Sequence, residues 1–243
     1  MTNWIAANWP APANIHALTT LRAGGVSVQG YSSLNPAAHV SDRLEHVVAN
    51  RQRIKQMLNL PTDPVYLQQT HSTRAVCADQ VQGVPEADAS YTAENNIVCA
   101  VLTADCLPIL LCDSSGNQVA AIHGGWRGLL NGIIENAVAQ IPDSDILAWL
   151  GPAIGSACFE VGEDVYHAFI SQSPSFEPAF KAQGTGKYLA DIYQIARIRL
   201  NKLGVQKIYG GDFCTVSDKQ RFFSYRRDGQ ETGRMLTLIW KSA

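Results

Sequence analysis

Two histidines and one cysteine occupy similar positions, at the ends of three predicted strands. His71 follows the apolar residues 65–67, Cys106 follows the apolar run that ends at Thr103, and His123 ends the run 119–123. Imidazole nitrogen and thiolate sulfur are typical metal ligands, and three protein ligands leave a fourth position open for water or substrate. The pattern therefore predicts a catalytic metal site formed by His71, Cys106 and His123.

Each of these residues taken alone has a simpler interpretation. A cysteine in an apolar run is usually a small buried hydrophobe, and this is our interpretation of the other five cysteines: Cys77, Cys99, Cys112, Cys158 and Cys214. Cys106 differs because Asp105 and Pro108 interrupt the apolar run around it. Asp105 is a candidate for acid–base chemistry or for orienting a ligand, and capping a turn is an equally good interpretation.

A glycine-rich turn follows His123 directly and contains Arg127. Glycines before a helix expose backbone N–H groups, and an arginine adds a forked donor, so the turn predicts a pocket for phosphate or carboxylate. A tight strand-to-helix turn is the alternative. Arg22 and Arg226 are further candidates for substrate contacts, whereas Arg227 and Asp228 are interpreted as solvated loop charges.

Several catalytic motifs are absent from the chain. It has no H-x-E followed by C-x-x-C, which the usual zinc nucleobase deaminases require, and no H-E-x-x-H, G-x-S-x-G, P-loop or G-x-G-x-x-G. The six histidines include no H-x-H pair. This argues against blue-copper and trinuclear copper sites.

Composition restricts the class of protein. The 243 residues are 46% hydrophobic and 16% charged, which excludes a disordered chain. The net charge of −2 gives no reason to expect binding to nucleic acid or to a membrane. The first residues lack a basic segment followed by an apolar one, and six cysteines without a signal peptide fit reduced thiols. We therefore predict a cytoplasmic protein that acts on a small molecule, with its oligomeric state left open.

Strand and helix patterns alternate irregularly along the chain. Apolar runs bounded by turn residues predict strands at 15–20, 65–68, 97–103, 109–112, 119–123, 146–150, 207–209 and 235–240. Helical spacing predicts helices over 47–58, 129–141 and 189–203, and residues 171–187 are expected to form a surface loop. Because the order is not strictly strand–helix–strand, an α+β fold is favoured, with residues 1–243 as a single domain.

Six segments of the chain together resemble one known family, the YfiH family, also called the laccase-domain or polyphenol oxidase family. The segments are Gln69-Thr70-His71, Thr103-Ala104-Asp105-Cys106-Leu107-Pro108, His123-Gly124-Gly125-Trp126-Arg127-Gly128, Trp149-Leu150-Gly151-Pro152, Phe159-Glu160-Val161-Gly162 and Phe223-Ser224-Tyr225-Arg226-Arg227-Asp228. The resemblance covers nearly the whole chain, from the Thr20-x-Arg22-x-Gly24-Gly25 segment to the last strand.

This resemblance implies a layered mixed β-sandwich flanked by helices, related to the cysteine hydrolase fold of cytotoxic necrotizing factor. It also implies a zinc ion at His71, Cys106 and His123.

The activities that the resemblance implies are phosphorolysis of adenosine, inosine, guanosine and methylthioadenosine, and deamination of adenosine. We take a zinc-dependent purine nucleoside enzyme as the leading hypothesis, with Arg127 holding phosphate.

Three alternatives stay open. The first is a peptidoglycan editing factor, which hydrolyses wrongly incorporated serine from a UDP-muramoyl precursor, either with metal assistance or with Cys106 as the nucleophile. The second is a copper-dependent polyphenol oxidase, since Cys/His sites bind copper more tightly than zinc. The third is a non-enzymatic protein that binds metal or nucleoside.

Overall fold

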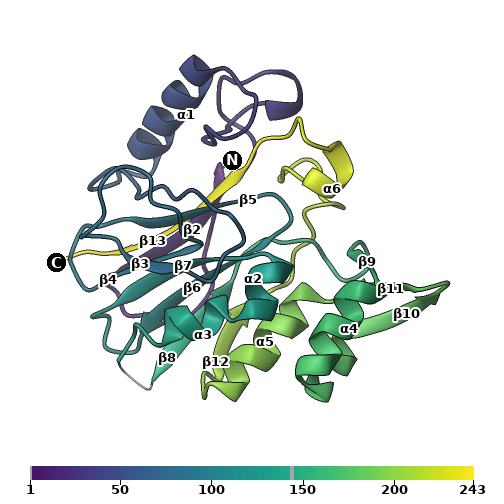
Figure 1. The fold of residues 1–243 in the computed structure, drawn as a ribbon. Coiled ribbons are helices and arrows are strands. Elements are labelled where there is room, and N and C mark those ends of the chain that lie inside the picture. The colour runs from purple at the N-terminus through teal and green to yellow at the C-terminus, as the bar shows by residue number, and fades with distance from the viewer. Residues whose placement is uncertain (1, 143–144) are drawn as a thin grey trace.

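The computed structural model describes residues 2–142 and 145–243, which form three β-sheets with helices around them (Figure 1). The strands are β1 Trp4–Ala6, β2 Ile15–Thr20, β3 Ala75–Cys77, β4 Ala89–Thr92, β5 Cys99–Thr103, β6 Leu107–Asp113, β7 Val119–Gly124, β8 Ile146–Leu150, β9 Glu160–Gly162, β10 Phe180–Gly184, β11 Lys187–Ala190, β12 Lys207–Gly210 and β13 Met235–Lys241. The helices are α1 Leu44–Met57, α2 Trp126–Asn131, α3 Ile133–Val138, α4 Glu163–Gln172, α5 Ile192–Lys202 and α6 Tyr225–Asp228, with short 3-10 helices at Gln29–Tyr31 and Pro174–Ala179.

Two larger sheets pack face to face. One has the strand order β1-β2-β13-β5 and is antiparallel throughout. The other has the order β12-β8-β6-β7-β4-β3, with parallel pairs at its two edges and antiparallel pairs in its centre. Side chains from both sheets share one buried cluster that includes Val101, Leu110, Trp149 and Ile239. The α+β prediction is therefore confirmed at the level of a mixed fold with several sheets and helices.

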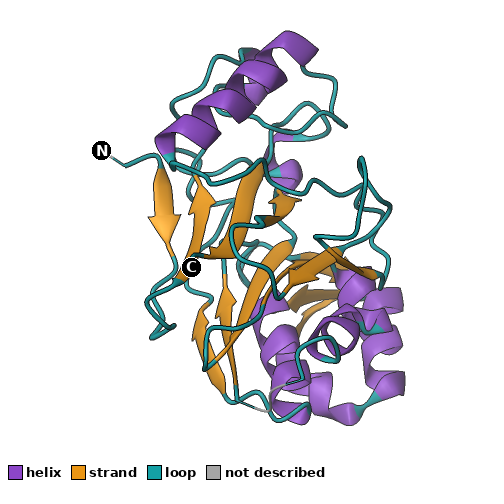
Figure 2. Cartoon of the chain, turned by 90° about the vertical axis from the view of Figure 1, so that its left-hand side faces the viewer, coloured by secondary structure: helices purple, strands orange, loops and turns teal. Residues whose placement is uncertain are grey.

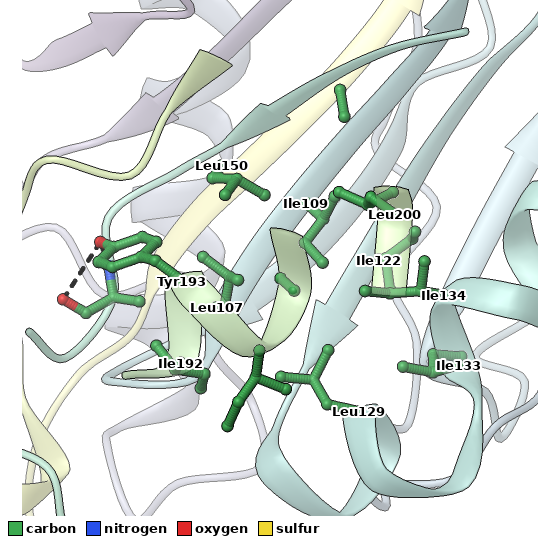
Figure 3. Close-up of a cluster of buried hydrophobic side chains, with 14 of the residues drawn as sticks. Leu107, Ile109, Ile122, Leu129, Ile133, Ile134, Leu150, Ile192, Tyr193 and Leu200 are labelled. Atoms are coloured by element: carbon green, nitrogen blue, oxygen red, sulfur yellow. Dashed lines mark hydrogen bonds between the residues drawn. The ribbon is translucent and has the colours of Figure 1, made fainter. Parts of the chain in front are cut away.

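The helices α2, α3 and α5 cover the outer face of the six-stranded sheet, whereas α1 and neighbouring loops pack on the outer face of the four-stranded sheet. Alternate residues of β6, such as Ile109, point away from the facing sheet and belong to one buried cluster with Leu129, Ile133 and Leu200 of the helices α2, α3 and α5 (Figure 3). On the other side, Ile54 of α1 belongs to a buried cluster with residues of the four-stranded sheet. Figure 2 shows α1 well apart from the helices that cover the six-stranded sheet. Each fully buried side chain of this size contributes roughly 1.5–3 kcal/mol, so the β-strands between these layers are firmly held. No helix of residues 2–142 and 145–243 has the length and apolarity to cross a membrane.

Three predicted elements differ from the structure. The predicted helix over 129–141 is broken into α2 and α3, because Gly132 adopts a left-handed conformation with φ of 102°. The predicted helix over 189–203 begins at Ile192, since residues 187–190 pair as β11. Residues 65–68 form isolated bridges at Val65 and Gln68 and no continuous strand.

The prediction of a surface loop over residues 171–187 was wrong. This segment contains a 3-10 helix, Pro174–Ala179, and the strand β10, which pairs with β11. Phe176 in the 3-10 helix is buried against Phe169 of α4. The residues of β10 are almost all exposed, so the strand lacks the apolar alternation by which a strand is recognised in sequence.

Candidate metal centre and pocket

The three predicted metal ligands come together in the structure. Cys106 lies in the turn between β5 and β6, His123 near the end of β7, and His71 in the loop before β3. The antiparallel pairing of Pro108 with His123 brings the Cys106 turn beside the second histidine. The ligand atoms of the three residues lie within 4.8 Å of one another, and Cys106 Sγ is 3.6 Å from His71 Nε2.

A buried carboxylate, Asp88, positions both histidines. Its Oδ1 lies 2.7 Å from His123 Nδ1, so the carboxylate accepts the Nδ1 proton and His123 presents Nε2 to the centre. It also accepts the backbone N–H groups of Thr70, His71 and Ser72. These bonds stabilise the turn in which His71 has a φ of 61°, a conformation that non-glycine residues seldom adopt.

The amide of Gln69 anchors the same loop to the sheet. Its Nε2 donates to the Leu102 carbonyl and its Oε1 accepts the Leu102 N–H, each at 2.8 Å. The Gln69 side chain therefore makes the two backbone hydrogen bonds that a neighbouring strand would otherwise make with Leu102 of β5. This contact gives a structural reason for the Gln69-Thr70-His71 segment.

Gly125 is required by close packing against the ligands. A Cβ atom at this position would lie 2.9 Å from His71 Nε2 and 3.4 Å from Cys106 Sγ. Any side chain here would therefore displace the histidine. The glycine-rich turn thus has a steric function at the metal centre.

The donor set fits a tetrahedral zinc ion. Zn–N distances of about 2.0 Å and Zn–S distances of about 2.3 Å put two tetrahedral ligands roughly 3.5 Å apart, close to the spacing of His71 Nε2 and Cys106 Sγ. Two imidazoles and one thiolate leave a fourth position open. Within the described residues, this is the one group of three such side chains that could hold a metal ion.

The charges of the metal-free centre are strongly coupled. Burial alone would raise the pKa of the Cys106 thiol, but the His123 imidazole and then His71 lower this pKa to about 6. Burial alone would lower the pKa of His123, but the Cys106 thiolate and Asp88 raise it to about 9. Burial opposes ionisation of Asp88, yet His123 and then Ser72 lower its pKa to about 2. A thiolate and an imidazolium are therefore the stable pair near neutral pH.

Asp105 adjoins this pair but has both carboxylate oxygens in use. Oδ1 accepts the Thr215 hydroxyl and Oδ2 accepts the backbone N–H of Arg226, each at 2.6 Å. Asp105 itself has a φ of 94°, and its carbonyl accepts the Ile154 N–H. The residue therefore ties the Cys106 turn to two distant segments of the chain.

The three predicted metal ligands line a cavity of about 530 Å³, a volume suited to a small-molecule ligand. Its apolar wall is formed by Leu102, Trp126, Ile154, Phe159, Ile192 and Tyr225. The polar lining consists of His39, Gln69, Thr103, Asp105, Arg127, Arg226 and Arg234, besides the three metal ligands.

The three predicted substrate-binding arginines have different environments. Arg127 is exposed at the cavity, lies over the Trp126 ring, and has no ion-pair or hydrogen-bond partner in the part of the chain that the structure describes. Arg226 lines the cavity but donates from Nη1 to the carbonyls of Cys158 and Glu160. Arg22 is not among the lining residues, and its guanidinium donates to the carbonyls of Ser32, Lys219 and Phe222.

Sequence reasoning missed Asp88, His39 and Arg234. Asp88 had one usable signal, because it is a charged residue between alanines in a segment that starts a strand, and it is completely buried. His39 and Arg234 had none, since they reach the cavity from opposite ends of the chain.

Comparisons with known proteins agree over nearly the whole chain. The family model described as multi-copper polyphenol oxidoreductase laccase matches residues 16–242. A Haemophilus influenzae protein named purine nucleoside phosphorylase is 49% identical over 240 residues, covering 97% of this chain and 98% of that protein. The Escherichia coli K12 protein named purine nucleoside phosphorylase YfiH is 48% identical and covers 99% of each chain. The crystal structure of a Neisseria meningitidis protein of the DUF152 family has a TM-score of 0.95 and 48% identity, covering 99% of this chain and 100% of that one.

Proposed function

The chain belongs to the multi-copper polyphenol oxidoreductase laccase family, which includes the YfiH proteins, and from that premise we propose that it is a zinc-dependent enzyme that cleaves purine nucleosides by phosphorolysis. The observation that carries the proposal is the convergence of three metal-competent donors and the unpaired Arg127 on one cavity. The names of the relatives supply the reaction class.

The residues lining the cavity suit a purine nucleoside and phosphate as the two substrates. Phe159, Trp126 and Tyr225 provide aromatic surface for a purine base, and Arg127 provides a free guanidinium for phosphate. Arg226 keeps Nε and Nη2 without hydrogen-bond partners among the described residues, so it can add a second contact to the anion. In the reaction a phosphate oxygen attacks C1′ of the ribose, and the glycosidic electron pair leaves with the purine, which takes up a proton.

His71, Cys106 and His123 would hold the metal, and Asp88 keeps the proton of His123 on Nδ1. When bound there, zinc would supply Lewis-acid polarisation and would lower the pKa of water, which the deamination of adenosine also requires. Asp105 has both oxygens occupied by neutral donors, which supports a positioning role for it beside Cys106.

Two alternatives keep specific support. The description of the matching family favours copper, and a site with two imidazoles and a thiolate binds Cu(II) more tightly than Zn(II). The thiolate–imidazolium pair of Cys106 and His123 is the arrangement of a cysteine hydrolase, which favours amide hydrolysis of a cell-wall precursor.

One set of assays separates these functions. Zinc-loaded protein is incubated with adenosine with and without phosphate, with a serine-containing muropeptide precursor, and, after copper loading, with a phenol. We expect adenine and ribose 1-phosphate in the phosphate arm, inosine without phosphate, and neither in Cys106→Ala. Turnover of the muropeptide or the phenol alone would overturn the proposal, and metal and nucleoside binding without turnover in any arm would identify a non-enzymatic protein.

We also propose that residues 1–243 are one domain of the cysteine hydrolase fold and that the protein is cytoplasmic. Strands from the two ends of the chain, β2 and β13, pair with each other, and residues from both ends share one buried cluster. This supports a single domain. All six cysteines are free, which supports a reducing compartment.

A further inference from the structure

Two cysteines outside the metal centre lie on neighbouring loops beside the cavity. Cys158 precedes β9, and Cys214 precedes the turn 215–217. Their Sγ atoms contact the same hydroxyl, Ser217 Oγ, at 3.6 Å for Cys158 and 3.3 Å for Cys214. Both side chains are partly exposed. The two sulfurs are therefore within reach of one another and of a small solute.

We propose that Cys158 and Cys214 form an oxidation site, in which a hydroperoxide converts the two thiols into an intramolecular disulfide. The nucleophilic thiol is Cys214, because its sulfur accepts the backbone N–H of Gly155 and the hydroxyl of Ser217, each at 3.3 Å. Hydrogen bonds to sulfur stabilise the thiolate.

The electrostatics of the two thiols agree with this assignment. Burial raises the pKa of Cys214, but the hydrogen bonds from Ser217 and Gly155 outweigh it, so the pKa lies below the usual value. Ser217 lowers the pKa of Cys158, but burial and the neighbouring Cys214 outweigh it, so that pKa is raised. A thiolate next to a neutral thiol is the arrangement of a peroxide-reactive cysteine with its resolving partner.

The chemistry balances in two steps. The Cys214 thiolate attacks one oxygen of the hydroperoxide, an S–O bond forms, the O–O bond breaks, and the leaving oxygen takes a proton. Cys158 then attacks the sulfenic sulfur, an S–S bond forms, and the hydroxyl leaves as water. Two thiols and one hydrogen peroxide thus give one disulfide and two waters.

Two contacts connect this site with the cavity. Thr215, next to Cys214, donates its hydroxyl to Asp105, which adjoins the metal ligand Cys106. Cys158 precedes Phe159 of the cavity wall, and its carbonyl accepts Arg226 Nη1. A disulfide that pulls the two loops together would shift both of these hydrogen bonds. We therefore expect oxidation to raise the nucleoside KM at least threefold, a consequence that rests on the proposed function.

The test uses zinc-loaded full-length protein treated with hydrogen peroxide, followed by alkylation, proteolysis and mass spectrometry. We expect a peptide pair joined through Cys158 and Cys214, two hydrogens lighter than the reduced pair and released by dithiothreitol. Cys158→Ser and Cys214→Ser should each abolish it, and Cys158→Ala guards against an effect of the serine hydroxyl. Cys77→Ser is the matched control, because Cys77 is also partly exposed but contacts Asp79, and it should keep the linked pair.

Sulfinic or sulfonic acid at Cys214 without the linked pair, or a link through any other cysteine, would overturn the proposal. The nucleoside KM is measured before oxidation, after it, and after reduction, in the wild type and in Cys158→Ser. A linked pair with an unchanged KM rejects the connection with the cavity. Protein inactive on nucleosides in both states contradicts the proposed function, and the mass measurement still decides whether the oxidation site exists.

Discussion

Asp88 is hydrogen bonded to both histidines of the candidate metal centre, through the ring of His123 at 2.7 Å and through the backbone N–H of His71 at 3.1 Å. One carboxylate therefore sets the tautomer of one ligand and the backbone conformation of the other. The geometry of the centre depends on a residue that is not among those lining the cavity.

Asp88→Asn is expected to weaken zinc binding by about 10- to 100-fold, the range typical when a residue that hydrogen bonds to a metal ligand is replaced. An amide cannot accept all the N–H groups that converge on this carboxylate, and its own N–H₂ opposes the Nδ1 proton of His123. Competition with a chromogenic chelator measures the affinity. Asp79→Asn is the control, since Asp79 accepts from Thr92 away from the centre and should leave zinc affinity unchanged. Equal affinities in the two variants would refute the role of Asp88.

Cys106→Ala should lose zinc and all turnover while the fold survives, because the substitution removes a metal bond. Cys112→Ala is the contrasting variant: Cys112 is completely buried between the sheets, and burial raises its pKa to about 12. It should keep zinc and activity and lose about 1–2 kcal/mol of stability, as for a small core truncation. Zinc content, turnover and melting temperature are the readouts. Zinc retention with lost turnover in Cys106→Ala would identify a nucleophile instead.

Alkylation of Cys106 in metal-free protein should follow a thiolate with a pKa of about 6. The thiolate fraction rises as pH rises through the pKa, so the iodoacetamide rate should increase about tenfold from pH 5 to pH 7 and then level off. An ordinary thiol continues to gain reactivity beyond pH 8. Peptide mapping follows Cys106 separately, and zinc should protect it. A midpoint near pH 9 would contradict the thiolate–imidazolium pair.

Arg127→Ala should raise the phosphate KM of nucleoside cleavage at least tenfold and should slow adenosine deamination much less. A charged hydrogen bond lost from a site costs roughly 1.5–3 kcal/mol. Arg43→Ala removes another exposed guanidinium, one that is ion paired with Glu45, and serves as the control for net charge. Steady-state kinetics at varied phosphate provide the measurement. An equal loss of both activities would show that Arg127 supports the turn.

The three residues of the candidate metal centre could be selected from the sequence because local signals mark them. Cys106 and His123 each stand where an apolar run meets turn residues, and side chains at such strand ends gather at the same edge of a sandwich. The Leu129 amphipathic pattern likewise predicted helical residues, but Gly132 was not recognised as a break. The left-handed φ of Gly132 concerns the backbone of a single residue. The spacing of apolar residues around it therefore gives no sign of the break.

The partners of these ligands could not be predicted. Asp88 reaches His123 across 35 positions of sequence, and Asp105 meets Thr215 across 110. Those contacts depend on strand order, with β4 beside β7 and the β5–β6 turn beside the loop before α6, and no local pattern encodes strand order.

The sequence by itself determined the donor types, a mixed fold of strands and helices, and seven of the thirteen described β-strands, because hydrophobic periodicity and turn residues act over a few positions. Only the tertiary structure decided that Asp88 orients the histidines and that Cys158 and Cys214 meet at Ser217. It also decided that Arg127 has no hydrogen-bond partner among the described residues, while carbonyl groups bind Arg22. These facts depend on distances between segments far apart in the chain, which packing of the sheets and helices sets.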